Sequence, residues 1–135
     1  MKTKGYTLFI LSLLVIPALL AQKPVQTLEV LYFHATRRCP TCMAIEENTR
    51  KTLNTWFADQ LKKGTVKLTV VDVDDEKNKA LAEKYEATGS ALFITKTTTD
   101  KESKNDMTDF AFSYARNNPD KFIRGMKDKI SALLK

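Results

Sequence analysis

The only two cysteines of this 135-residue chain, Cys39 and Cys42, are separated by Pro40 and Thr41. A cysteine attacks as its thiolate, and a helix N-terminus or a nearby cation stabilises that anion. A helical pattern begins at the pair, and Arg38 directly precedes it. The second sulfur lies one helical turn from the first and can close a small disulfide with it. The pair therefore predicts thiol–disulfide exchange.

The two cysteines are expected to play different parts. Cys39 would attack a disulfide of a partner protein, and Cys42 would resolve the mixed disulfide; the reverse cycle would oxidise the partner. Pro40 suits the first turn of a helix, and Thr41 offers a hydroxyl to a sulfur. No flavin or nicotinamide fingerprint occurs in the chain. The expected cofactor is therefore none beyond the redox-active disulfide itself.

Less specific interpretations of these residues stay open. The cysteines can form a plain structural disulfide, although so short a loop constrains the unfolded chain little. A zinc site needs four ligands, and two cysteines with the single histidine, His34, fall short, so no metal site is predicted. His34 is either a proton-exchange group or an ordinary residue at a strand end. Arg37 and Arg38 are either solvated or stabilise the thiolate.

The N-terminus has the pattern of a secretory signal peptide, assigned to residues 1–21. Lys2 and Lys4 precede an apolar run at residues 7–20 that contains Pro17. This run is shorter than the roughly 20 residues of a spanning helix. We therefore predict export to the periplasm or the outside, with an uncleaved membrane anchor as the alternative. Either location is oxidising and allows a disulfide to persist.

Composition predicts one globular domain, residues 22–135, expected to be monomeric. The chain is 43% hydrophobic and 28% charged, with a net charge of +6. Two of those positive charges, Lys2 and Lys4, lie in the leader. Lysines alternate with acids through the rest of the chain, and no run of like charges suggests nucleic-acid binding. A membrane would be contacted only through an uncleaved leader.

The hydrophobic periods place the dithiol between a strand and a helix. Predicted strands cover residues 27–33, 66–74, 90–95 and 102–107, and predicted helices cover residues 39–63, 78–86, 108–116 and 119–134. The helix at 39–63 has an apolar face, and both Trp56 and Phe57 are expected in the core. Gly64 is expected to end that helix.

This order of elements resembles the thioredoxin-fold dithiol oxidoreductases across residues 27–134. The resemblance implies an α/β fold with a central mixed sheet of about four strands flanked by helices, and the CxxC at the N-terminus of the first helix. Residues 32–42, Tyr-Phe-His-Ala-Thr-Arg-Arg-Cys-Pro-Thr-Cys, are also similar to a small exported group described as a subunit of a nitrophenyl-compound nitroreductase system.

The chain departs from the thioredoxin pattern on the side facing the dithiol. The family carries a cis-proline there, and this chain has Ala91 after Ser90. A non-proline residue favours the trans bond, so a cis bond at Ser90–Ala91 is not expected. The site would be more open, and the dithiol better able to take a soft metal or metalloid ion.

Two further family residues are replaced. Many thioredoxins carry a buried acid on the first strand that serves the resolving cysteine, and the equivalent position here is Tyr32 or Phe33. Asp72, on the second predicted strand, is a candidate substitute for proton exchange; its alternative role is that of an acid ending a strand. Arg38 stands where a tryptophan is usual, which makes the partner-facing surface cationic.

The favoured interpretation is an exported thiol–disulfide oxidoreductase that acts on protein disulfides or passes electrons to a partner reductase. The subgroup resemblance implies an alternative, an accessory subunit in nitroaromatic or arsenical handling whose dithiol relays electrons or binds a metalloid. A third interpretation is a non-enzymatic binding module with a structural disulfide.

Overall fold

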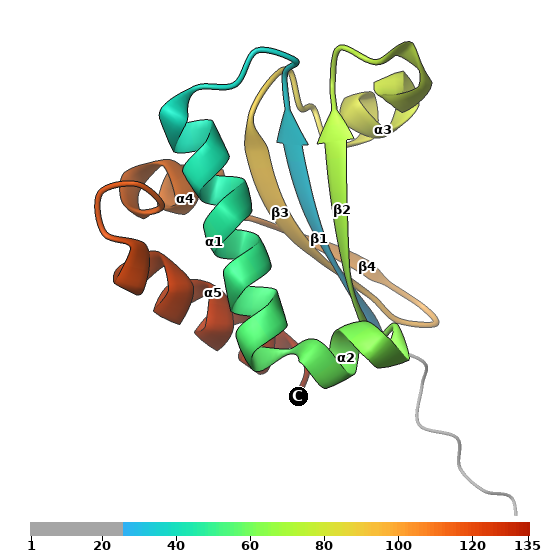
Figure 1. The fold of residues 1–135 in the computed structure, drawn as a ribbon. Coiled ribbons are helices and arrows are strands. Elements are labelled where there is room, and N and C mark those ends of the chain that lie inside the picture. Colours follow the sequence, from blue (N-terminus) through green and yellow to red (C-terminus); the bar gives the residue numbers. More distant parts are fainter. Residues whose placement is uncertain (1–25) are drawn as a thin grey trace, which may run out of the picture.

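The computed structural model describes residues 26–135, so the predicted leader lies outside the described residues (Figure 1). The elements are β1 (Thr27–His34), α1 (Pro40–Trp56), α2 (Ala58–Lys63), β2 (Val66–Asp72), the 3-10 turn η1 (Glu76–Asn78), α3 (Lys79–Lys84), β3 (Ala91–Thr97), β4 (Glu102–Asp106), α4 (Thr108–Tyr114) and α5 (Pro119–Leu133). The predicted α/β fold with a four-stranded mixed sheet is confirmed.

The sheet places the end of β1 beside the start of the dithiol helix. Its strand order is β2-β1-β3-β4. β1 pairs with β2 in parallel and with β3 antiparallel, and β4 runs antiparallel to β3. β1 lies in the interior of the sheet and is buried on both faces, which explains its nearly continuous apolar sequence. Because β1 and β2 are parallel, His34 and Asp72 lie side by side at the same end of the sheet, where both strands finish.

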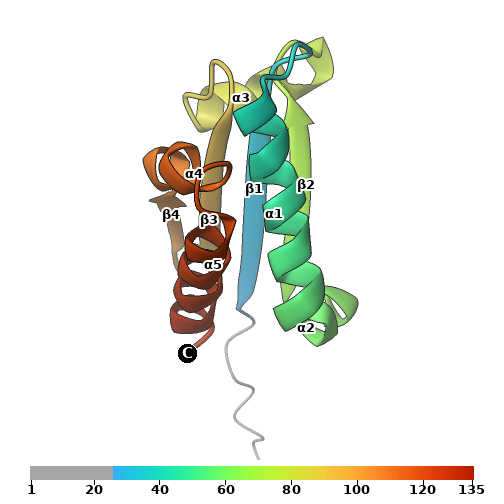
Figure 2. The same cartoon turned by 60° about the vertical axis from the view of Figure 1, so that its left-hand side comes forward.

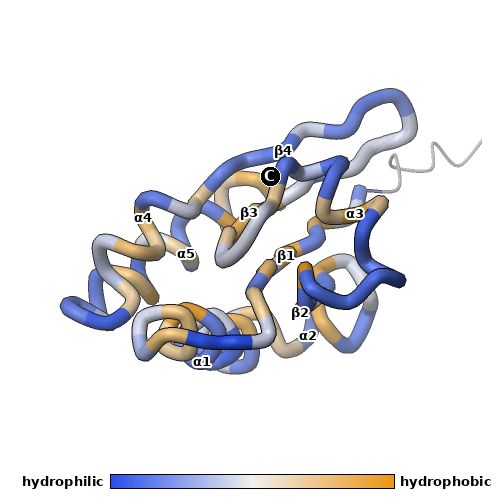
Figure 3. The backbone as a smooth tube through the Cα atoms, turned by 90° about the horizontal axis from the view of Figure 1, so that it is seen from above, coloured by the Kyte–Doolittle hydropathy of each residue, from blue (hydrophilic) through white to orange (hydrophobic). Residues whose placement is uncertain are grey.

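Two layers of helix cover the sheet. Helices α1, α4 and α5 lie on one face and α3 on the other, as the views across and along the strands show (Figures 2 and 3). The larger core lies between the sheet and α1 with α5, and includes Tyr32, Ile45, Phe122 and Met126. The smaller core, under α3, is aromatic: the Phe33, Tyr85 and Phe93 rings lie within 6.0 Å of one another, centroid to centroid.

The prediction of one continuous helix over residues 39–63 is wrong. The chain leaves helical geometry at Phe57 (φ −131°, ψ 24°), which separates α1 from α2. Phe57 is buried as expected, but Trp56 is 50% exposed, so its assignment to the core is also wrong. The break turns the two neighbouring aromatics in different directions. The Trp56 ring instead carries the ammonium group of Lys127 at 3.8 Å, a cation–π contact on the surface.

Element ends differ from the predictions where local backbone hydrogen bonds turn the chain. β2 stops at Asp72 instead of residue 74, because the Asp75 N–H bonds back to the Asp72 carbonyl at 3.3 Å. The helix predicted at residues 78–86 is a 3-10 turn followed by the short α3. Gly64 ends α2 as predicted, with φ at +73°, in the left-handed region that glycine tolerates.

Helices α4 and α5 meet through an aromatic ring placed against a glycine. Phe110 of α4 stacks on Phe122 of α5, with ring centroids 5.9 Å apart, and contacts Tyr114 edge-on at 5.2 Å. A Cβ atom built on Gly125 would lie 2.3 Å from the Phe110 ring. The absence of a side chain at Gly125 is therefore what lets α4 pack this closely on α5.

Candidate functional site

The dithiol sits at the N-terminus of α1, as predicted. Cys39 is the N-cap residue with extended backbone geometry (φ −79°, ψ 160°), and Pro40 begins the helix. The Cys42 N–H donates to Cys39 Sγ at 3.0 Å. The two sulfurs are joined in a disulfide, with the Cα atoms 5.0 Å apart. The helix end thus offers its unpaired N–H groups to the sulfur of Cys39, which favours a thiolate there when the bond is open.

The two cysteines differ in access to solvent. Cys39 and Pro40 are exposed, whereas Cys42 is 8% exposed and belongs to the core side of α1. Thr41 is half-buried between them. A sulfur that attacks another protein must be reachable, and a resolving sulfur needs to reach only its neighbour. The geometry therefore favours the predicted order of roles, with Cys39 as the attacking and Cys42 as the resolving sulfur.

Tyr32 contacts the dithiol from beneath, a contact that sequence analysis missed. Its hydroxyl donates to the backbone carbonyl of Cys42 at 2.7 Å, and its side chain is fully buried. Burial raises the pKa of the Tyr32 hydroxyl, although Ser90 and Arg38 oppose this effect. One indication of this contact was present in the sequence: Tyr32 lies on the buried strand, at one of the two positions equivalent to the buried acid of many thioredoxins.

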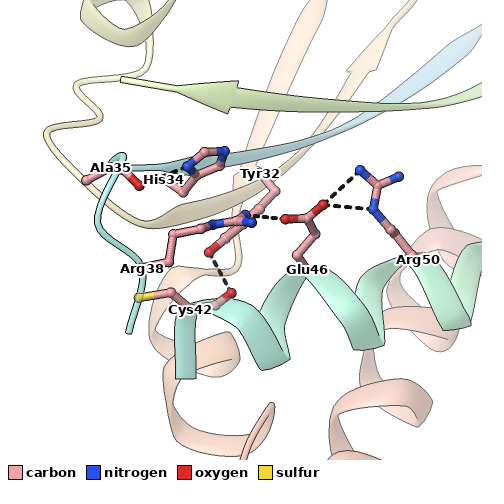
Figure 4. A network of polar contacts seen from close by, with 7 residues as sticks. All are labelled: Tyr32, His34, Ala35, Arg38, Cys42, Glu46 and Arg50. Carbon is pink, nitrogen blue, oxygen red and sulfur yellow. Dashed lines mark hydrogen bonds and ion pairs between the residues drawn. The ribbon is translucent and has the colours of Figure 1, made fainter. Parts of the chain in front are cut away.

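Arg38 does not stand free in front of the cysteines. Its guanidinium is ion-paired with Glu46 of α1 and lies over the Tyr32 ring, 5.7 Å from the centroid (Figure 4). Glu46 also accepts from Arg50 Nε at 2.8 Å. Burial alone would raise the pKa of the Glu46 carboxyl, but hydrogen bonds and charge from the two arginines outweigh it and lower that pKa.

Glu46 is a second residue that sequence analysis did not identify as part of the site. It lies one helical turn after Cys42 and eight residues after Arg38. Burial disfavours the charged form of Arg38, but its pairing with Glu46 raises the pKa of the guanidinium above the ordinary value. The i, i+4 relation of Glu46 and Arg50 was visible in the sequence, whereas the pairing with Arg38 depends on how the loop before α1 folds.

His34 and Asp72 lie together where β1 and β2 end, but their polar contacts are with the loops that follow these strands rather than with the sulfurs. His34 Nδ1 is 3.0 Å from the Ala35 carbonyl oxygen. Asp72 accepts from the Thr36 hydroxyl at 3.0 Å and from the Asp74 N–H at 3.0 Å. These bonds tie the loop before the cysteines to the end of β2. They favour the role of Asp72 as a strand-end acid, and proton exchange by either residue stays a prediction.

Ser90 and Ala91 form the segment that leads into β3. Ala91 begins that strand and pairs with Phe33 of β1, which brings it to the same end of the sheet as the dithiol. No peptide bond within residues 26–135 is cis, so the expected trans geometry at Ser90–Ala91 is confirmed. Both residues also line a surface cavity of about 500 Å³ together with Tyr85 and Phe93. Ala91 packs against the smaller core under α3, on the face of the sheet opposite α1.

Neither a metal cluster nor a membrane-spanning helix is found in the described part of the chain. No group of three or more histidine, cysteine or acidic side chains is placed to hold a metal ion between residues 26 and 135. Over the same residues, no helix has the length and apolar character needed to cross a bilayer.

Comparison with known proteins adds little to this geometry. No family model and no curated protein matches the chain. A solved structure described as "Structure of a malarial protein" is similar, with 20% identity and a TM-score of 0.44 over 74% of this chain and 97% of that one. Function must therefore be argued from the site itself.

The bond between Tyr32 and the Cys42 carbonyl predicts a measurable loss of stability in a Tyr32→Phe variant. Removing the hydroxyl deletes one buried hydrogen bond, so the free energy of unfolding should fall by about 1 kcal/mol. Urea unfolding of the oxidised protein measures this. Tyr114→Phe is the control, because that side chain is only half-buried, and it should change stability little. Equal stability of Tyr32→Phe and wild type would contradict a stabilising role for the bond.

Proposed function

We propose that this chain is a thioredoxin-like thiol–disulfide oxidoreductase whose redox centre is the Cys39–Cys42 pair. One observation carries the proposal: an exposed cysteine caps the N-terminus of α1, and its disulfide partner lies buried three residues further on. The helix end lowers the cost of a thiolate on the accessible sulfur. The order of the elements, with helices between β1 and β2, between β2 and β3 and after β4, and the mixed sheet support the same interpretation.

The exchange has two steps. The Cys39 thiolate attacks one sulfur of a partner disulfide, forming a mixed disulfide and releasing a partner thiolate, which takes a proton from solvent. The Cys42 thiol loses its proton and attacks Cys39 Sγ, which restores the Cys39–Cys42 bond and releases the second partner sulfur. Two electrons and two protons pass from the dithiol to the partner disulfide. The reverse sequence oxidises a partner dithiol.

The partner is a protein thiol or disulfide, or a reductase that exchanges electrons with the dithiol. Export by the N-terminal leader would place this exchange in an oxidising compartment, where the direction of electron flow depends on the partner. The surface next to Cys39 suits a polypeptide. Met43 is 50% exposed and, with Arg38, Glu46, Glu47 and Arg50, lines a shallow hollow of about 400 Å³.

A second candidate is the accessory role in nitroaromatic or arsenical handling. Its structural support is the pair itself: Cys39 is exposed, and its Cα atom lies 5.0 Å from that of Cys42, so the two thiolates of the reduced protein can bind one soft ion together. Arsenite added to the reduced protein should then protect both thiols from alkylation. Alkylation at an unchanged rate would remove the metalloid part of this candidate.

Redox equilibration tests the main proposal. The purified domain is incubated in glutathione buffers of graded ratio and the fraction of Cys39–Cys42 disulfide is measured by thiol alkylation. A reversible transition, together with catalysed reduction of insulin by dithiothreitol, is the expected result. A disulfide that stays closed in excess dithiothreitol would instead favour the non-enzymatic module with a structural disulfide.

A further inference from the structure

An ion-pair cluster lies directly behind the dithiol and links it to the body of α1. Arg38, next to Cys39 in the chain, pairs with Glu46, and Glu46 also pairs with Arg50, whose Nη2 lies 2.8 Å from the carboxylate. The Glu46 side chain is only 16% exposed and that of Arg38 28% exposed. Charges this sheltered are screened by salt less than those of a fully solvated pair.

Glu46 governs where the Arg38 charge lies. The guanidinium reaches along α1 across the Tyr32 ring to Glu46, whereas the Cys42 sulfur points in the opposite direction (Figure 4). The Arg38 Nε atom is buried without a hydrogen-bond partner, so the ion pair with Glu46 is the polar contact that holds the guanidinium in place. The Glu46 carboxylate therefore offsets the charge of Arg38 and holds its guanidinium away from the Cys42 sulfur, to which Cys39 is bonded.

We propose that Glu46 is a positioning residue that limits the stabilisation of the Cys39 thiolate by holding Arg38 over Tyr32. This inference rests on the proposed dithiol function, and it adds a residue that tunes it. With a neutral side chain at position 46, Arg38 keeps its charge at the N-terminus of α1, without compensation and free to turn toward the sulfur. The thiolate is then stabilised further, and the dithiol becomes more oxidising.

Other charged and titratable groups surround the same end of the sheet. They are Tyr32 and His34 on β1, Arg37 in the loop before α1, Asp72 at the end of β2, Asp74 just after it, and Glu47 and Arg50 on α1. All remain in a Glu46→Gln variant, but Arg50 also loses its ion-pair partner there. An Arg38→Gln background separates the effect of Arg50 from that of Arg38. Glu47→Gln is the matched control, because it removes the same charge one residue further along α1 from a side chain that is exposed.

The test measures the acidity of the Cys39 thiol in protein reduced with a phosphine, by its rate of alkylation as a function of pH. Glu46→Gln should lower the thiol pKa by about 0.5 units, whereas Glu47→Gln should shift it much less. Arg38→Gln should raise it. Because Glu46 acts through Arg38, its substitution in an Arg38→Gln background should shift the thiol pKa no more than Glu47→Gln does.

Three outcomes would overturn the inference: equal shifts for Glu46→Gln and Glu47→Gln, no shift for either, or a Glu46→Gln shift that persists in full without Arg38. Should Glu46→Gln fail to fold, Glu46→Asp keeps the carboxylate charge but shortens its reach to Arg38, and a smaller lowering of the thiol pKa in the same direction is expected. Alkylation of the reduced protein does not require catalysis. A disulfide that glutathione cannot open would therefore count against the proposed function while the effect of Glu46 could still be scored.

Discussion

Replacing Cys42 by serine is expected to trap the protein on its partners. The accessible Cys39 can still attack a disulfide, but no second sulfur lies three residues further on to resolve the mixed disulfide. Turnover in an insulin-reduction assay should fall by at least about 100-fold, and covalent complexes sensitive to dithiothreitol should accumulate. Non-reducing gels of the variant mixed with a disulfide-bonded substrate measure both effects.

Replacing Cys39 by serine should abolish turnover to a similar extent without forming such complexes. The remaining sulfur, that of Cys42, is 8% exposed and its backbone is held by Tyr32, so it cannot readily reach another protein. The double variant, with serine at both positions, controls for non-specific adducts. Complexes formed by Cys39→Ser and absent from Cys42→Ser would reverse the assigned roles. Full activity in both single variants would contradict thiol–disulfide exchange altogether.

Alanine at Gly125 is expected to destabilise the packing of α4 on α5. Its Cβ would meet the Phe110 ring at 2.3 Å, and that ring is held between Tyr114 and Phe122. Overpacking of this kind costs about 1–3 kcal/mol, and the better helix propensity of alanine returns at most about 1 kcal/mol. We therefore expect a net loss of roughly 1–2 kcal/mol in the free energy of unfolding, measured by urea titration of the oxidised protein.

Gly89→Ala is the control for this experiment. A Cβ at Gly89 has nothing within 4 Å, and the backbone there does not require glycine, so this variant should keep the stability of wild type. A Phe110→Leu change in the Gly125→Ala background should recover part of the loss, because it removes the ring that the new methyl group meets. A Gly125→Ala variant as stable as wild type would show that α4 moves aside at no cost.

Much of the fold was predictable because it depends on local periods. Strand and helix order follows from apolar spacing at two and at 3.6 residues, and the structure confirms a four-stranded mixed sheet. The position of Cys39 at a helix start was also predictable, because Pro40 suits a first turn and the helical pattern begins there. The break at Phe57 was not predictable in this way, since the apolar pattern continues through it.

The environment of the dithiol was less accessible to sequence analysis. Arg38 was expected beside the thiolate, and nothing in the spacing indicated that it pairs with Glu46 across the Tyr32 ring. Asp72 was considered as a proton-exchange group, whereas its bonds are to Thr36 and the Asp74 backbone. In both cases the residue type suggested a role, and the direction of the side chain determined its partner.

The proposed chemistry follows from a ten-residue stretch, because two cysteines at helical spacing after a buried strand bring their sulfurs together without help from the rest of the chain. The sequence alone does not show how that chemistry is controlled. Which cysteine is reachable, where the Arg38 charge lies and what supports Cys42 depend on β1 passing beneath α1 and on a loop tied to β2. Those contacts join residues through packing and strand pairing, which no local pattern specifies.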